Sequence, residues 1–369
     1  MTGTEGPGQV GVPLVARRDD ISALEAYHSP QLDVPVRLNT NESPYPPPPD
    51  FVDAWLSALR EVPLNRYPDR SARGLRSAIA QQQGTTADRV FCANGSNEVL
   101  QTLFLTYGGF GRRAAVFEPT YALHSHIARI TGTEVVVGER REDFALDIDA
   151  AAALIAETAP HLVLVCSPNN PTGTVEPREA IEALLAVAPG IVVVDEAYGE
   201  FADWSAVDLV SEERPLVVAR TYSKVWSMAA LRLGFCVGPR WLVRELDEVV
   251  LPYHLAAPTQ LAGTVALRFE SEMAARVQRL VDGREELVVE LSKLEGVDVF
   301  PSGANFVLIR PHGRGHRLWE LLVDRGVLVR DFSEWPRLDD CLRVTVGTVE
   351  ENQRFLAAMR EALPEVTEA

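Results

Sequence analysis

Short apolar runs recur through the middle of the chain and alternate with stretches that have a helical pattern of apolar and polar residues. Each run has the length of one strand and is bounded by turn residues, which is typical of a strand buried on both faces of a parallel sheet. The runs are 90–92, 114–117, 135–137, 162–165, 191–194, 215–219 and 234–237. Strands that alternate with helices predict an α/β fold, in which a mostly parallel, seven-stranded sheet carries helices on both faces.

The pattern changes on either side of this region. Residues 274–294 predict a long charged helix, followed by strand-like 305–309, a helix near 316–325 and strand-like 341–346. These elements predict a smaller α+β domain. A proline-rich arm before the first helix is expected to be irregular, because prolines at such density favour an extended path. We therefore divide the chain into an N-terminal tail and arm (1–45), a large domain (46–257) and a small C-terminal domain (258–369).

Three of the central runs end in polar clusters. The run 162–165 leads to Asn170, the run 191–194 leads to Asp195 and Tyr198, and the run 215–219 leads to Ser223 and Lys224. Ligands of open α/β sheets bind at the carboxyl ends of the strands, so these groups are expected to converge. An amine that bonds an aldehyde and an anion for a ring nitrogen are what pyridoxal phosphate requires. Taken singly, a lysine is usually a surface residue and an aspartate after a strand usually caps a helix.

Together these motifs resemble those of the fold-type-I pyridoxal-phosphate aminotransferases, and most closely those of the histidinol-phosphate aminotransferases. The resemblance runs from about Tyr27 to beyond Arg343 and includes Asn-Pro-Thr-Gly at 170–173, Asp195 with Tyr198, and Ser-Lys at 223–224. It implies pyridoxal 5'-phosphate as the cofactor. It also implies transamination of L-histidinol phosphate with 2-oxoglutarate, which gives imidazole acetol phosphate and glutamate in histidine biosynthesis.

The resemblance assigns roles to the residues around the cofactor. Lys224 attaches the cofactor and moves a proton, Asp195 faces the pyridine nitrogen, and Tyr198 with Asn170 contacts the 3-oxygen. The remaining cofactor contacts that it implies are Ser96, Asn97, Ser223 and Arg232 at the phosphate, Tyr121 stacked on the ring, and Tyr67 at the phosphate of the partner subunit's site. The chain departs from the family after Lys224, where two positions that are often glycine are Ser227 and Ala230.

Substrate contacts are implied in the same way. Arg343 corresponds to the arginine that holds the substrate carboxylate or its alcohol equivalent, and Arg330 and Tyr27 correspond to residues that hold the substrate phosphate. Asn41 and Glu42 lie in a segment that resembles the family's active-site arm. Two other activities share the fold and remain open: an aromatic amino-acid (phenylalanine) aminotransferase and a threonine-phosphate decarboxylase.

The composition of the chain limits the kinds of partner that it is expected to have. The chain of 369 residues has a formal net charge of −17, which argues against nucleic acid or an anionic membrane as a partner. Its four cysteines form no metal-binding or disulfide-dense pattern, which favours a reducing, cytoplasmic location and no metal site. Because Tyr67 and Tyr27 are expected to act across a subunit interface, we expect a homodimer with shared active sites and small-molecule substrates.

Overall fold

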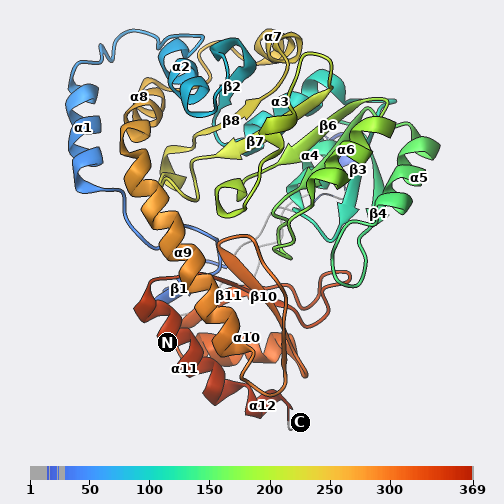
Figure 1. The fold of residues 1–369 in the computed structure, drawn as a ribbon, viewed down its shortest axis with the longest axis vertical. Helices are drawn as coiled ribbons and strands as arrows, with labels where there is room; N and C mark the ends of the chain where they lie inside the picture. The colour runs from blue at the N-terminus through green and yellow to red at the C-terminus, as the bar shows by residue number, and fades with distance from the viewer. Residues whose placement is uncertain (1–14, 16, 23, 25–29, 368–369) are drawn as a thin grey trace.

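The computed structural model describes residue 15, residues 17–22, residue 24 and residues 30–367. The larger of its two sheets has seven strands, in agreement with the number of apolar runs (Figure 1). Their spatial order is β2 (Val90–Ala93), β8 (Gly234–Val237), β7 (Leu216–Thr221), β6 (Ile191–Asp195), β5 (Leu162–Cys166), β3 (Arg113–Glu118) and β4 (Glu134–Glu139). Only β8 runs antiparallel to its neighbours in this sheet, so the predicted mostly parallel fold is confirmed.

Alternate residues of these strands serve two separate cores. In β5, Leu162 and Leu164 pack on one face, and Val163 and Val165 pack on the other. The first face is covered by α3 (Ser96–Tyr107), α4 (Leu123–Ile130) and α7 (Arg240–Val249), and the second by α5 (Ile148–Thr158) and α6 (Arg178–Val187). Burial on both faces explains why the runs are continuously apolar rather than alternating.

The second sheet has five strands, in the order β1 (Val36–Leu38), β11 (Val327–Asp331), β12 (Leu342–Thr345), β10 (Phe306–Pro311) and β9 (Val297–Val299). It packs with α10 (Gly315–Asp324) and α11 (Val349–Ala362), and α12 (Pro364–Thr367) contacts α11 in the lower part of Figure 1. A capping box starts α11, since Thr348 and Glu351 each accept from the other's backbone N–H. This unit is the predicted α+β region.

The arm is more regular than we predicted. Val36–Leu38 forms strand β1, which pairs in parallel with β11, so part of the arm belongs to the second sheet. Three residues with a buried–exposed–buried pattern carry too weak a signal to be recognised alone. The strand exists because β11 offers it a free edge.

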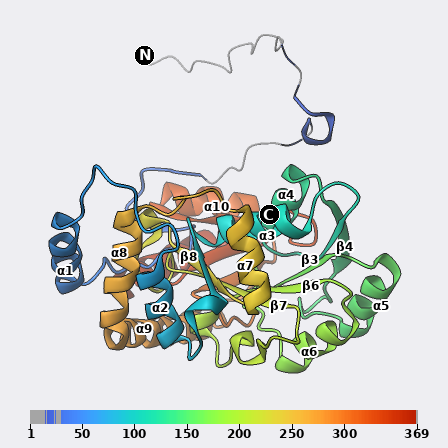
Figure 2. The ribbon, with the colours of Figure 1, turned by 90° about the horizontal axis from the view of Figure 1, so that it is seen from above.

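Four α-helices of the described residues remain, besides several short 3-10 helices. The helices α1 (Pro49–Arg60) and α2 (Arg73–Gln82) both contact α8 (Ala257–Ala266). The long α9 (Glu270–Leu291) then runs from the large sheet down to the small one in Figure 1, and Figure 2 shows it on the same side of the molecule as α1, α2 and α8. The carboxyl ends of the central strands therefore face the second sheet and the arm across one cleft. No helix in the described part of the chain is both long and apolar enough to cross a membrane.

Candidate active site

A cleft of about 410 Å³ lies at the carboxyl ends of β5, β6 and β7. It is lined by side chains from the large sheet, the start of α3, the arm and β12. The predicted site residues that it brings together are Asn41, Ser96, Asn97, Tyr121, Asn170, Asp195, Tyr198, Ser223, Lys224, Arg232 and Arg343. Glu42 of the arm lines the same cleft.

Lys224 enters the cleft from the turn after β7. Its Nζ donates a hydrogen bond to the carbonyl oxygen of Thr40 at 3.0 Å, so the arm and the strand end meet at the amine. Burial, followed by the positive charge of Arg343, lowers the Lys224 pKa to about 8, although the Glu42 carboxylate acts in the opposite direction. An amine with this pKa is partly uncharged near neutral pH, as a nucleophile or proton carrier must be.

Asp195 ends β6 with its carboxylate almost fully buried. Its Oδ1 accepts from the backbone N–H of Ala197 at 3.1 Å, and its Oδ2 lies 3.0 Å from Nε2 of the fully buried His124. Because a carboxylate can only accept, His124 donates through Nε2. The ring of Tyr121 packs edge-to-face against the His124 ring, with centroids 5.5 Å apart. Two donors therefore hold the carboxylate in one orientation at the floor of the cleft.

The phenol of Tyr198 is held from the arm. Asn41 Nδ2 donates to Tyr198 Oη at 2.9 Å, and burial raises the Tyr198 pKa to about 12. Asn41 itself has a φ of 57°, and Thr345 Oγ1 donates to its Oδ1 at 2.9 Å. Arg343 donates through Nη1 to Asn170 Oδ1 and through Nη2 to a carbonyl oxygen of the arm. These contacts connect the second sheet to the turns of the large sheet that carry Asn170 and Tyr198.

A cup of donors lies at the start of α3. A Cβ on Gly95 would lie only 2.5 Å from Nη2 of Arg232, so the guanidinium rests directly against the helix N-terminus. Arg232 Nη1 is 3.4 Å from Ser223 Oγ, and Ser96 opens the helix. A helix N-terminus, a hydroxyl and a guanidinium together favour a dianion. The cup therefore fits the phosphate of pyridoxal phosphate, with Lys224 and Asp195 placed in the same cleft.

Tyr121 connects the cup to the aspartate. Its hydroxyl donates to Asn97 Oδ1 at 3.3 Å, while its ring meets His124. The side chain thus lies along the cleft wall between the phosphate cup and Asp195. This is the position that a ring stacked on the cofactor would need.

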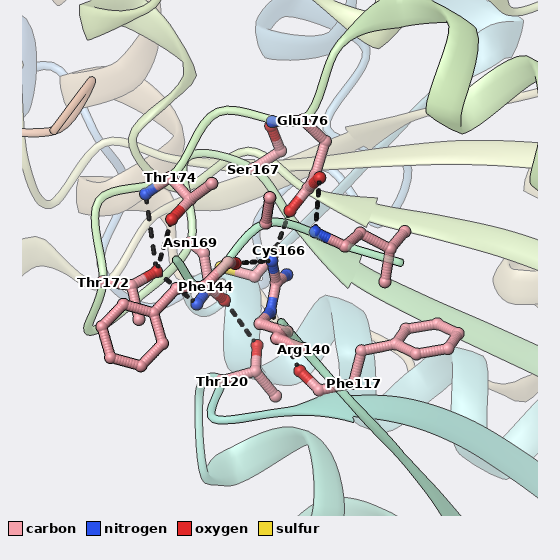
Figure 3. A network of polar contacts seen from close by, with 12 residues as sticks. Phe117, Thr120, Arg140, Phe144, Cys166, Ser167, Asn169, Thr172, Thr174 and Glu176 are labelled. Atoms are coloured by element: carbon pink, nitrogen blue, oxygen red, sulfur yellow. Dashed lines mark hydrogen bonds and ion pairs between the residues drawn. The ribbon is translucent and has the colours of Figure 1, made fainter. Parts of the chain in front are cut away.

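A buried polar network supports the turn that carries Asn170 (Figure 3). Arg140 and Glu176 form an ion pair with both side chains almost fully buried. Thr120 Oγ1 donates to Asn169 Oδ1 at 2.7 Å, which ties this turn to the segment after β3. Buried polar groups need such partners, because an unpaired one costs about 1–3 kcal/mol. The network therefore holds the Asn170 turn in one conformation.

Two predicted residues lie outside the main cleft, and a third is not among the described residues. Arg330 does not line the main cleft but a small cavity beside it, whose lining also includes Tyr121 and Arg343. Tyr67 is 80% exposed and stacks on Tyr253 with ring centroids 4.5 Å apart. Tyr27 lies outside the described residues, so its predicted role stays a prediction.

Comparison of the sequence with known protein families identifies the family of this chain. The pattern of the class I and II aminotransferases matches residues 34–359 of the chain. The chain belongs to this aminotransferase family. Histidinol-phosphate aminotransferases of Thermobifida fusca (strain YX) and Rhodococcus opacus (strain B4) are 45% identical over 355 residues and 43% identical over 372 residues. These alignments cover 94% of both chains for the first and 98% of this chain and 97% of the relative for the second.

Solved structures agree on the fold of this aminotransferase. The histidinol-phosphate aminotransferase of Sinorhizobium meliloti, crystallised with pyridoxal-5'-phosphate, superposes with a TM-score of 0.83. The superposition covers 90% of this chain and 92% of that chain, at 21% sequence identity. At this identity the comparison supports the fold-type-I architecture.

Our sequence reasoning missed His124 of this aminotransferase. The sequence analysis assigns His124 no role, whereas in the structure His124 is the partner of Asp195. The contact joins residues 71 positions apart, and no local pattern in the sequence marks it. A departure that we did notice has a structural consequence: Ser227, where the family often has glycine, has a φ of 54°, a region that favours glycine.

Proposed function

We propose that this aminotransferase transfers the amino group of L-histidinol phosphate to 2-oxoglutarate with pyridoxal 5'-phosphate as cofactor, giving imidazole acetol phosphate and glutamate. The observation that carries the proposal is a cleft that holds a lysine of lowered pKa and the buried Arg343, with the buried Arg330 in the adjoining cavity. Relatives that are 41–45% identical over nearly the full chain and are named histidinol-phosphate aminotransferases support the same reaction.

The cofactor contributes an aldehyde that accepts an amine and a ring that takes up electrons from the substrate. The protein supplies the rest. Lys224 Nζ would hold the cofactor and move a proton to and from the substrate, and its lowered pKa keeps part of the amine neutral for this purpose. Asp195, fixed by His124, would keep the ring nitrogen protonated, and Tyr198 and Asn170 would hold the ring through its 3-oxygen.

Two neighbouring arginines bind the anionic groups of the substrates. Arg343, which lines the main cleft, binds the carboxylate of glutamate or the corresponding end of histidinol phosphate. Arg330, in the adjoining cavity, binds the phosphate with Tyr27. An arginine suits a phosphate better than a lysine does, because its planar fork makes two parallel hydrogen bonds.

A homodimer is part of the proposal. Tyr67 is exposed and stacked on Tyr253, and Leu64 and Leu251 are also more than three-quarters exposed. An apolar surface of this kind is what a partner subunit covers. We infer that Tyr67 reaches the phosphate cup of the partner. The four free, buried cysteines fit a cytoplasmic location.

The test is a substrate panel with the purified, cofactor-loaded protein. Histidinol phosphate should have the highest kcat/KM when it is compared with phenylalanine, tyrosine and threonine phosphate. A preference for phenylalanine would instead make the protein an aromatic aminotransferase. Release of carbon dioxide from threonine phosphate would make it a decarboxylase.

A further inference from the structure

Two buried arginines face each other across strands of the second sheet. Arg330 of β11 and Arg343 of β12 are direct partners in the antiparallel register. Their exposed fractions are 7% and 5%. Like charges directly opposite each other on one face of a sheet repel, and burial weakens the screening by water. Something on this face must therefore hold both guanidinium groups in place while the anion site is formed.

The ring of Phe332 lies against both arginines. The Arg330 guanidinium carbon lies 5.7 Å from the Phe332 centroid, and that of Arg343 lies 5.4 Å from the same centroid. Strand geometry explains the arrangement, because Phe332 follows Arg330 by two positions and so shares its face. Phe332 continues the pairing of β11, since its backbone N–H donates to the carbonyl oxygen of Cys341 at 3.0 Å.

The ring is itself fixed from behind. Trp335 packs on Phe332 edge-to-face with centroids 5.0 Å apart, and its backbone N–H donates to the Phe332 carbonyl oxygen at 2.8 Å. Both aromatic residues line the small cavity with Arg330 and Arg343. Arg343 lies in addition over the ring of Phe306, at 5.1 Å. The two arginines therefore differ in their aromatic support, and Phe332 is the ring that they share.

We propose that Phe332 is a positioning residue for anion recognition, holding the guanidinium groups of Arg330 and Arg343 beside one aromatic ring so that both reach the phosphate end of histidinol phosphate. The negative face of an aromatic ring attracts each cation and offsets part of their repulsion. This inference rests on the proposed function, because it assumes that the arginines bind a substrate phosphate.

Replacement of the ring by an aliphatic side chain tests this role. Phe332→Leu should raise KM for histidinol phosphate about 3- to 30-fold, the range for loss of a partly buried cation–π contact. The kcat should change little, because the arginines bind ground state and transition state alike. With unphosphorylated histidinol as the amino donor, the same substitution should change kcat/KM by less than about 2-fold. The separate substitution Phe332→Tyr should leave KM for histidinol phosphate at the wild-type value, because it keeps the aromatic ring.

The matched control is Phe300→Leu. Phe300 also lies under a guanidinium, with Arg310 at 5.4 Å, and packs beside the same small core as Phe332. It lines neither the main cleft nor the small cavity. Phe300→Leu should therefore leave KM for histidinol phosphate unchanged, and it reports any general loosening of the second sheet.

The outcomes separate the inference from the function on which it rests. The proposed function is wrong if the wild-type protein does not use histidinol phosphate. It is also wrong if Arg330→Ala leaves kcat/KM for histidinol phosphate unchanged. If Arg330→Ala weakens the phosphate substrate but Phe332→Leu does not, the positioning role of Phe332 is wrong. Equal losses with histidinol and histidinol phosphate, or a raised KM with Phe332→Tyr, would also overturn it.

Discussion

The pKa of Lys224 gives the most direct test of the site geometry, because the chain has only two lysines, Lys224 and Lys293. Lys293 lies on the surface beside Glu290, with 63% of its side chain exposed. In the variant Lys293→Arg, Lys224 is the only side-chain amine. Its titration is then measurable in apo-protein by the pH dependence of acetylation, followed by mass spectrometry of its peptide.

The structure sets the magnitude of this effect. With a pKa of about 8, about a quarter of the Lys224 amine is neutral at pH 7.5, compared with about 0.1% for an ordinary lysine. Acetylation of Lys224 at that pH should therefore be roughly two hundred times faster than its ordinary pKa would allow, if access to the reagent is equal. The rate should reach half its maximum near pH 8 and level off above pH 9.

Two substitutions should move this midpoint in opposite directions. Glu42→Gln should lower it, because the Glu42 carboxylate favours the charged amine. Arg343→Gln should raise it, because the Arg343 guanidinium disfavours the charged amine. A midpoint near 10.5 in the parent variant, or a rise with Glu42→Gln, would refute the electrostatic account of the site.

Three further predictions concern the substrate, the assembly and the aspartate. Arg330→Ala should lower kcat/KM for histidinol phosphate by roughly 10²–10³, equivalent to about 3–4 kcal/mol, and affect the glutamate half-reaction much less; equal losses in single-turnover assays would contradict the phosphate role. Mixed subunits of inactive Lys224→Ala and Tyr67→Ala protein should regain partial activity, whereas proven hybrids without activity would place each site within one chain. His124→Phe should lower the free energy of unfolding by about 1–3 kcal/mol in urea titrations, because the buried Asp195 loses a donor; an unchanged midpoint would show that this contact contributes little.

The sequence alone determined the large domain and the order of its polar motifs. Burial on both faces requires continuous apolar runs, so strands such as β5 and β6 are recognisable without any tertiary information. Parallel strands end at one edge, so Asn170, Asp195 and Lys224 had to converge once the runs were recognised as strands. Predictions from such patterns are strong because a local signal and a general rule of sheet topology suffice.

Only the tertiary structure decided the contacts between distant segments. Strand β1 exists because β11 pairs with it, and His124 meets Asp195 because α4 packs on the large sheet. The register of β11 and β12 places Arg330 opposite Arg343, and the pKa of Lys224 depends on burial and on charges from the arm and β12. None of these features has a local signature, because each depends on the distance between groups that the sequence places far apart.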